Sequence, residues 1–134
     1  MAVFLSDSAE ETEKFGRRYA ARLKGGDVVV LNGEMGAGKT VFCKGVAKGL
    51  KIEEEVLSPT YAYMNDYDGK LYHFDCYRLK SGEQAEALGL CDYFYANGVC
   101  LIEWAENIAD VLPPERKTVT IEKLADGRRR IIYE

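Results

Sequence analysis

The chain has 134 residues, with 18 Lys or Arg against 22 Asp or Glu, so its formal net charge is −4. This length fits one domain spanning residues 1–134, and the acidic balance excludes a protein that coats DNA or RNA through its overall charge. Hydrophobic residues make up 47% of the chain and only 3 residues are Pro, a composition typical of folded proteins rather than disordered ones.

The sequence carries no targeting or membrane signal that we recognise. No apolar stretch approaches the roughly 20 residues that a membrane helix needs, and the N-terminal MAVFLSDSAEETEKF lacks the basic flank and apolar core of a secretion signal. We therefore expect a cytoplasmic protein. The chain has four cysteines without a CxxC pair and a single histidine, which argues against structural zinc. Since each cysteine lies in or beside an apolar segment, we expect buried, reduced thiols at Cys43, Cys76, Cys91 and Cys100.

The first third of the chain predicts a helix, a strand and a second helix. A capping box at Ser8 and Glu11, followed by apolar residues every four positions, predicts an amphipathic helix that ends before the Gly pair at 25–26. The run VVVL at 28–31 is typical of a strand that is buried on both faces. A helix after position 40 would have an apolar face and two glycines that allow close packing, at Gly45 and Gly49.

The rest of the chain predicts mainly strands. Two β-prone runs flank Asp68-Gly69, which suits a type I′ hairpin turn, and two more flank Asp126-Gly127. Between these hairpins, a capping box at 81–84 opens a short helix, and VCLI at 99–102 predicts a second buried strand. The fold class is therefore α/β, with a central, largely parallel sheet, flanking helices and antiparallel hairpins.

The segment GEMGAGKT at 33–40 fits the phosphate-binding pattern GxxxxGK[ST] and lies between a predicted strand and a predicted helix, as that pattern requires. Glycines let the backbone curl so that its amides face a polyphosphate, and the start of the next helix adds positive charge. Lys39 supplies a cation for the β- and γ-phosphates, and Thr40 a hydroxyl for Mg²⁺. The alternative is an ordinary glycine turn with a chance Lys-Thr. We predict nucleotide binding by Gly33, Glu34, Met35, Gly36, Ala37, Gly38, Lys39 and Thr40.

Two acids and two further residues are candidates for the same site. Glu103 ends the second buried strand, where parallel sheets present their ligands, and is either a magnesium anchor or a solvated acid. Asp75 in HFDCYRL either positions the attacking water or caps a turn. Thr60 either senses the γ-phosphate or belongs to a rigid Ser-Pro-Thr turn. Arg128 either lies over the base or is solvated.

Five segments together resemble the TsaE family, also called YjeE, of small bacterial P-loop ATPases required to make threonylcarbamoyladenosine at position 37 of tRNAs. The resemblance covers nearly the whole chain and is specific because the segments occur in the order and approximate spacing of that family. The segments are GEMGAGKT at 33–40, SPTYAY at 58–63, HFDCYRL at 73–79, LGLCDYF at 88–94 and LIEWAE at 101–106.

The resemblance implies an ATPase that uses ATP and Mg²⁺ and has weak activity by itself. It implies TsaD and TsaB proteins as partners, with tRNA contacted only through their complex. The family is not expected to transfer the carbamoyl group itself. The resemblance also implies Lys39, Asp75 and Glu103 as catalytic residues, Thr40 and Glu103 as magnesium ligands, Thr60 as a switch residue, and Ala9, Thr12 and Arg128 as nucleotide contacts. The chain departs from the usual family pattern at Glu34-Met35, where Asp-Leu is common, and at Ala105, where proline often follows the Glu-Trp pair.

Two other functions stay open at this point. A small-molecule kinase would use the same P-loop, although the short chain shows no obvious lid insertion for an acceptor. A guanine-nucleotide switch would need a guanine-recognition motif, and the sequence has no Asn-Lys-x-Asp.

Overall fold

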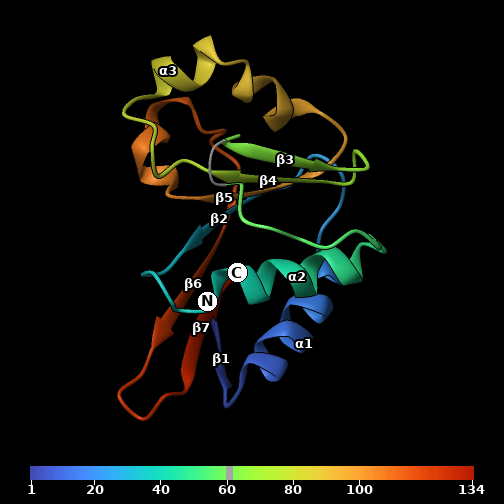
Figure 1. Ribbon diagram of the computed structural model, residues 1–134, viewed down its shortest axis with the longest axis vertical. Coiled ribbons are helices and arrows are strands. Elements are labelled where there is room, and N and C mark those ends of the chain that lie inside the picture. Colours follow the sequence, from blue (N-terminus) through green and yellow to red (C-terminus); the bar gives the residue numbers. More distant parts are fainter. Residues whose placement is uncertain (60–61) are drawn as a thin grey trace.

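The computed structural model describes residues 1–59 and 62–134. In these ranges one sheet has the strand order β1-β7-β6-β2-β5-β4-β3 (Figure 1). The strands are β1 (Ala2–Ser6), β2 (Val28–Asn32), β3 (Met64–Tyr67), β4 (Leu71–Asp75), β5 (Val99–Glu103), β6 (Lys117–Lys123) and β7 (Arg129–Tyr133). The α-helices are α1 (Ala9–Tyr19), α2 (Lys39–Gly49) and α3 (Gly82–Ala87), and the 3-10 helices are η1 (Ala20–Arg22), η2 (Leu90–Tyr95) and η3 (Ala105–Val111).

The centre of the sheet is parallel and its edges are antiparallel. Strand β2 lies between β5 and β6 and runs parallel to both, and β4 runs parallel to β5. The hairpins β3–β4 and β6–β7, and the pairing of β1 with β7, are antiparallel. The predicted α/β class, with its parallel centre and antiparallel hairpins, is confirmed.

Both hairpin turns fall at the dipeptides that predict them. Asp68 and Gly69 have φ angles of 61° and 68°, the pair of positive values that defines a type I′ turn. In the second hairpin only Gly127 has a positive φ, and its amide donates to the carbonyl of Leu124. That hairpin therefore turns through a longer loop, residues 124–128, that contains one left-handed glycine.

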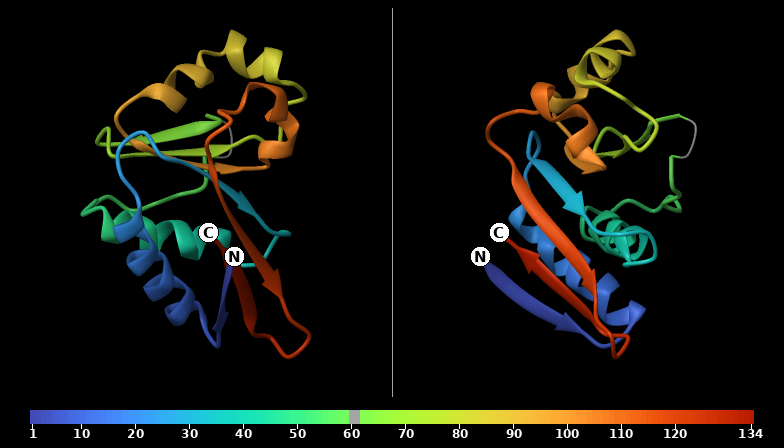
Figure 2. Two further views of the ribbon diagram at one scale, coloured as in Figure 1. Left: turned by 180° about the vertical axis from the view of Figure 1, so that it is seen from behind. Right: turned by 90° about the vertical axis from the view of Figure 1, so that its left-hand side faces the viewer.

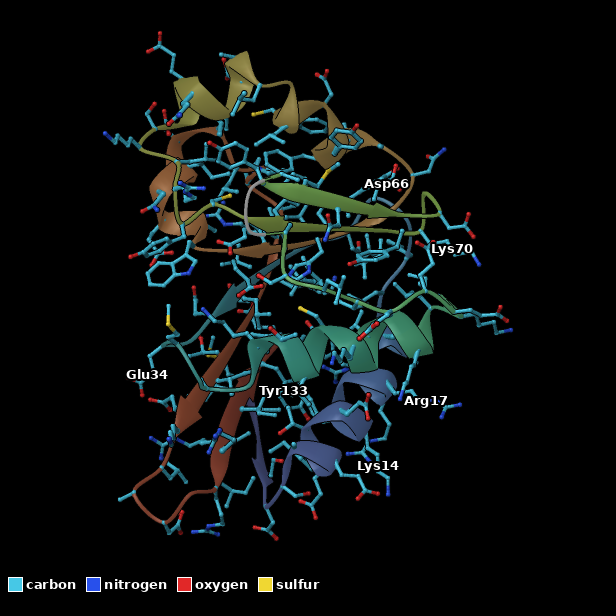
Figure 3. All side chains as sticks on the ribbon, viewed as in Figure 1. Lys14, Arg17, Glu34, Asp66, Lys70 and Tyr133 are labelled. Atoms are coloured by element: carbon cyan, nitrogen blue, oxygen red, sulfur yellow. The ribbon has the colours of Figure 1, made fainter. Side chains whose placement is uncertain are left out.

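Helices cover both faces of the sheet (Figures 1 and 2). Helices α1 and α2 pack on one face against Val29, Leu31 and Leu101, and α3 with η2 and η3 packs on the other against neighbours such as Val30 and Ile102. Alternate residues of β2 and β5 thus enter two different cores, which explains why both strands are continuously apolar in sequence. Figure 3 shows the charged side chains of Lys14 and Arg17 on the outer side of α1, away from these cores.

Helices α1 and α2 cross at very close range because glycines line the contact. A Cβ atom on Gly45 would collide with the backbone carbonyl of Glu13, and one on Gly49 would lie 2.6 Å from the carbonyl of Arg17. The close approach predicted for these two glycines is therefore confirmed.

Three features differ from the sequence-based expectation. Strand β1 has no counterpart in the prediction, yet it pairs with β7 along its whole length, and Phe4 stacks on Phe15 with ring centroids 4.9 Å apart. The 3-10 helices η2 and η3 were also not predicted. The cysteines are reduced, but Cys91 is only half-buried whereas the other three are buried.

Within the described ranges, every helix is too short or too polar to cross a bilayer.

Candidate functional site

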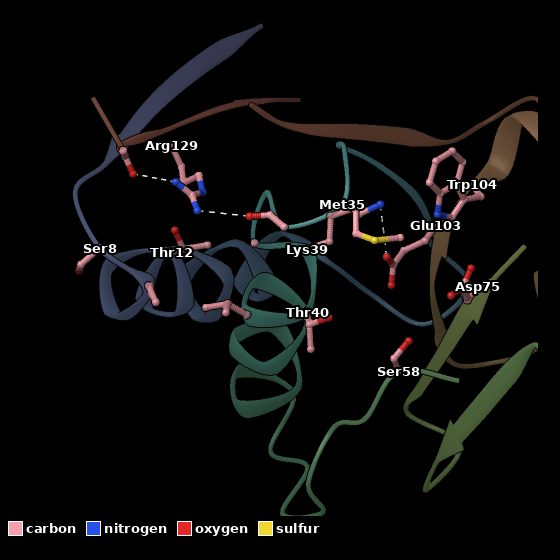
Figure 4. Close-up of a pocket in the computed structure, with 15 residues that line it drawn as sticks. Ser8, Thr12, Met35, Lys39, Thr40, Ser58, Asp75, Glu103, Trp104 and Arg129 are labelled. Carbon is pink, nitrogen blue, oxygen red and sulfur yellow. Dashed lines mark hydrogen bonds and ion pairs between the residues drawn. The ribbon is translucent and has the colours of Figure 1, made fainter. Parts of the chain in front are cut away.

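A cavity of about 490 Å³ opens where β2, β4 and β5 end and α2 begins (Figure 4). Ligands of open α/β sheets bind at this kind of edge. The sequence predicts nine of its lining residues, which are Ala9, Thr12, Met35, Gly36, Gly38, Lys39, Thr40, Asp75 and Glu103. The other lining residues are Ser8, Val41, Ser58, Trp104, Gly127 and Arg129.

Four other predicted residues, Gly33, Glu34, Ala37 and Arg128, do not line this cavity. Gly33 and Glu34 line an adjacent hollow of about 330 Å³ that also contacts Lys39, and Ala37 is fully buried in the loop. Arg128 is exposed beside the cavity wall, where its Nε donates to Asp126 Oδ2 at 2.7 Å. Thr60 lies outside the described residues.

The loop before α2 adopts a conformation that only glycine tolerates well. Gly36 and Gly38 have φ angles of 82° and 110°, and Gly38 is the N-cap of α2. Among the described residues no side chain caps this helix, so its first amides and the positive end of its dipole face the cavity. A loop of this kind binds anions, phosphates above all.

Arg129 holds this loop from the neighbouring hairpin. Its Nε donates to the carbonyl of Ala37 at 2.8 Å. Its Nη2 donates to the carbonyl of Gly36 at 3.2 Å, and its Nη1 to that of Gly127 at 2.7 Å (Figure 4). With its carbonyls bound to a guanidinium, the loop keeps a fixed conformation, and Arg129 adds a positive charge to the cavity wall. Arg129 shares a strand face with Ile131 and Tyr133, which pack against α1 and α2, so the alternation of side chains along β7 directs it toward the side of the sheet on which the loop lies.

Glu103 is buried at the cavity floor between two cationic partners. Its Oε1 lies 3.6 Å from Lys39 Nζ, and its Oε2 lies 2.6 Å from His73 Nε2. Lys39 Nζ also lies 4.9 Å from the centroid of the Trp104 ring, a cation–π contact. The lysine is therefore stretched across the floor of the cavity, between the loop and the acid.

The pKa values of Glu103 and His73 shift in opposite directions. Burial alone would raise the pKa of Glu103, but the hydrogen bond and charge of His73, together with Lys39, outweigh burial and lower it. Burial alone would lower the pKa of His73, but the Cys43 sulfur and Glu103 outweigh burial and raise it well above 6.5. His73 and Glu103 therefore form an ion pair over the neutral pH range.

This ion pair predicts an unusual pH dependence of stability. The raised pKa of His73 gives a contribution that is complete below about pH 6.5 and is lost as the pH rises through the folded-state value. The lowered pKa of Glu103 gives a contribution that is complete above about pH 4.5 and is lost as the pH falls through its folded-state value. We expect the free energy of unfolding, measured by urea denaturation, to fall from pH 6.5 to 8 by up to about 1.4 kcal/mol per pH unit.

The chain's one histidine makes the control direct. In a His73→Gln variant, which keeps a donor near Glu103 but does not titrate, this slope should disappear. An equal slope in the variant and the parent protein would show that another group causes it.

Asp75 lies opposite Glu103 in the β4–β5 register, so both side chains leave the same face of the sheet toward the cavity. Asp75 Oδ1 accepts a hydrogen bond from the backbone amide of Tyr77 at 3.0 Å. The carboxylate is therefore half-buried and oriented by a local turn, and it does not take part in the buried ion pair.

The start of α1 forms the opposite end of the cavity. Figure 4 shows Ser8, Thr12 and Arg129 at one end and Glu103, Trp104 and Asp75 at the other, with Lys39 and Thr40 between them. Thr12 is buried, and its hydroxyl lies 2.7 Å from that of Ser6 in β1. The α1 end of the cavity thus carries one guanidinium, that of Arg129, whereas the other end carries the carboxylates of Asp75 and Glu103.

A family model for the threonylcarbamoyl adenosine biosynthesis protein TsaE matches residues 6–131. A Treponema pallidum protein named tRNA threonylcarbamoyladenosine biosynthesis protein TsaE is 45% identical over 129 residues, covering 95% of this chain and 96% of the relative. A protein of the same name from Bacillus subtilis is 46% identical over 127 residues, covering 92% and 79%. A crystal structure of Bacillus subtilis YdiB superposes with a TM-score of 0.83 at 39% identity, covering 98% of this chain and 83% of that one.

Proposed function

This chain belongs to the TsaE family, and on that premise we propose that it is an Mg²⁺-dependent ATPase of tRNA threonylcarbamoyladenosine biosynthesis. One observation supports the proposal above all: a glycine-lined helix N-terminus, Lys39 and Glu103 converge on one cavity of about 490 Å³. We further propose that residues 1–134 form one ATPase domain acting in the cytoplasm.

The loop and its lysine bind the triphosphate in this proposal. The amides at the start of α2 face the phosphate oxygens, and Arg129 keeps the loop in the required conformation. Lys39 leaves Glu103 for the β- and γ-phosphates, because a polyphosphate offers it more negative charge than one carboxylate already paired with His73. The adenosine extends toward Ala9 and Thr12 at the α1 end of the cavity, away from the carboxylates of Asp75 and Glu103.

Thr40 and Glu103 are suitable ligands for Mg²⁺. A hydroxyl and a carboxylate are the hard oxygen donors that this ion prefers, and both side chains line the cavity. When bound there, Mg²⁺ would neutralise charge on the β- and γ-phosphates. Glu103 can supply Oε1 once Lys39 has moved, because His73 already holds Oε2.

Asp75 orients the attacking water in this proposal. Its carboxylate faces the cavity beside Glu103 and is held in place by the amide of Tyr77. In phosphoryl transfer the protein mainly contributes positioning and electrostatic stabilisation, so one well-oriented acceptor for a proton of water suffices.

An Asp75→Asn variant tests this role without disturbing the turn. The amide oxygen of Asn still accepts the Tyr77 hydrogen bond, but the side chain no longer carries the negative charge that orients water. We expect ATP turnover to fall by roughly 10²–10⁴-fold while ATP affinity changes by less than a few fold. The matched control is Asp66→Asn, an exposed residue of β3 whose Oδ1 accepts a hydrogen bond from the amide of Gly69 in the hairpin turn. Equal loss of affinity and turnover would contradict a role confined to hydrolysis.

The relatives are named for the biosynthesis of a tRNA modification, and we propose TsaD and TsaB as the partners that stimulate this chain, with tRNA contacted only through their complex. The test measures phosphate release with TsaD and TsaB added singly and together, with and without tRNA. We expect slow release alone and faster release with both partners. A phosphorylated acceptor in place of free phosphate would favour the small-molecule kinase instead.

A further inference from the structure

Three side chains that are far apart in the sequence meet beneath the cavity. Cys43 on α2, His73 on β4 and Glu103 at the end of β5 are separated by steps of 30 residues and are all buried. Cys43 Sγ lies 3.6 Å from His73 Nε2, which lies 2.6 Å from Glu103 Oε2, and the three potential ligand atoms all lie within 4.8 Å of one another. We call these three residues the Cys-His-Glu cluster.

The donor set and its spacing suit zinc. A sulfur, an imidazole nitrogen and a carboxylate oxygen are the ligands of Zn²⁺, whereas Mg²⁺ avoids sulfur. For tetrahedral Zn²⁺ with ordinary bond lengths the sulfur and nitrogen would lie about 3.5 Å apart, close to the observed 3.6 Å. The His73–Glu103 separation of 2.6 Å would have to widen to about 3.3 Å, which a rotation of the Glu103 side chain can provide.

The charges of a zinc complex at the cluster balance. Zn²⁺ bound to a thiolate, a neutral imidazole and a carboxylate carries no net charge, and the protons that the metal displaces from its ligands leave to solvent. The metal therefore brings no uncompensated charge into the buried site, although the ammonium of Lys39, 3.6 Å from Glu103 Oε1, limits the affinity.

We propose that Cys43, His73 and Glu103 form a zinc site whose occupation withdraws Glu103 from the magnesium position and so inhibits the protein. The metal reaches the cluster through the nucleotide cavity, because Glu103 belongs to both. Water in the cavity supplies the fourth ligand. The inhibitory effect rests on the proposed ATPase function, whereas zinc binding itself does not.

The binding test uses the full chain without nucleotide. Zn²⁺ is titrated in competition with a chromogenic chelator, and we expect one Zn²⁺ per chain, with affinity at least about tenfold weaker in a Cys43→Ser variant. The matched control is Cys100→Ser, a buried thiol outside the cluster whose Sγ donates to the Tyr93 carbonyl. Unchanged affinity in Cys43→Ser, or no stoichiometric binding by the parent protein, would overturn the site.

Cobalt provides a readout that needs no variant. Co²⁺ bound to the cluster should give a sulfur-to-metal charge-transfer band and the visible absorption of a tetrahedral site. If Cys43→Ser does not fold, the spectrum of the parent protein alone decides, and a spectrum without the sulfur band would overturn the site.

The inhibitory step has a separate test. ATP hydrolysis is measured at saturating Mg²⁺ with rising Zn²⁺ for the parent protein and Cys43→Ser. We expect the variant to need at least about tenfold more Zn²⁺ for half inhibition. Equal inhibition of both proteins would overturn the regulatory role. Because binding is measured without nucleotide, a failure of the ATPase proposal is distinguishable from a failure of the zinc site.

Discussion

Replacing Lys39 with Ala is expected to lower ATP hydrolysis by at least about 10²–10³-fold and to weaken ATP binding, while the fold is retained. Lys39 supplies the ammonium that spans the cavity floor between the glycine loop and Glu103, so its loss removes the mobile cation available to the β- and γ-phosphates. Phosphate release and nucleotide titration measure the two effects, and circular dichroism reports the fold.

The matched control is Lys48→Ala on the same helix. Lys48 is exposed and forms an ion pair of 2.9 Å with Glu13, far along α2 from the cavity, and an exposed pair contributes little to stability. We expect this control to hydrolyse ATP like the parent protein. If Lys39→Ala keeps full turnover, the cavity cannot be the site of hydrolysis.

A Gly45→Ala variant is expected to lower the free energy of unfolding by roughly 3 kcal/mol, although Ala usually stabilises a helix relative to Gly. The added Cβ would overlap the carbonyl of Glu13 and crowd the amide of Arg17, so α1 and α2 would have to separate. The aromatic contacts behind that crossing, such as Phe15 against Phe42 with ring centroids 6.1 Å apart, would separate with them. Urea denaturation measures the loss.

A Lys44→Ala change in the preceding position of α2 is the control, because the side chain of Lys44 is only partly buried and Ala favours the helix. We expect this variant to stay within about 0.5 kcal/mol of the parent protein. If Gly45→Ala is as stable as this control, the helices can repack at little cost and the close crossing is not essential.

Much of the fold was predictable because its signals are local. Turn dipeptides fix both hairpins, and continuous apolar runs identify the two central strands. Strand β1 gave no such signal, because its five residues become a strand only by pairing with β7 at the other end of the chain. The 3-10 helices η2 and η3 follow from packing on α3 and the sheet rather than from any periodicity.

The candidate site likewise contains residues that local sequence patterns identify and residues that they do not. The glycine loop is contiguous in sequence, so its residues are recognisable together, and strand ends point to Asp75 and Glu103. Arg129 and His73 were not predicted as site residues, because their roles depend on strand register. Arg129, the first residue of β7, binds the loop, whereas Arg128, one position earlier in the turn, is exposed and pairs with Asp126.

Calorimetric titration of the folded protein with ADP or a non-hydrolysable ATP analogue is the most direct measurement of nucleotide binding at the glycine loop. We predict saturable heat with one nucleotide per chain, and none in Lys39→Ala at the same concentrations. A parent protein that is fully folded and gives no heat with either nucleotide would contradict an ATP site at Gly33 to Thr40.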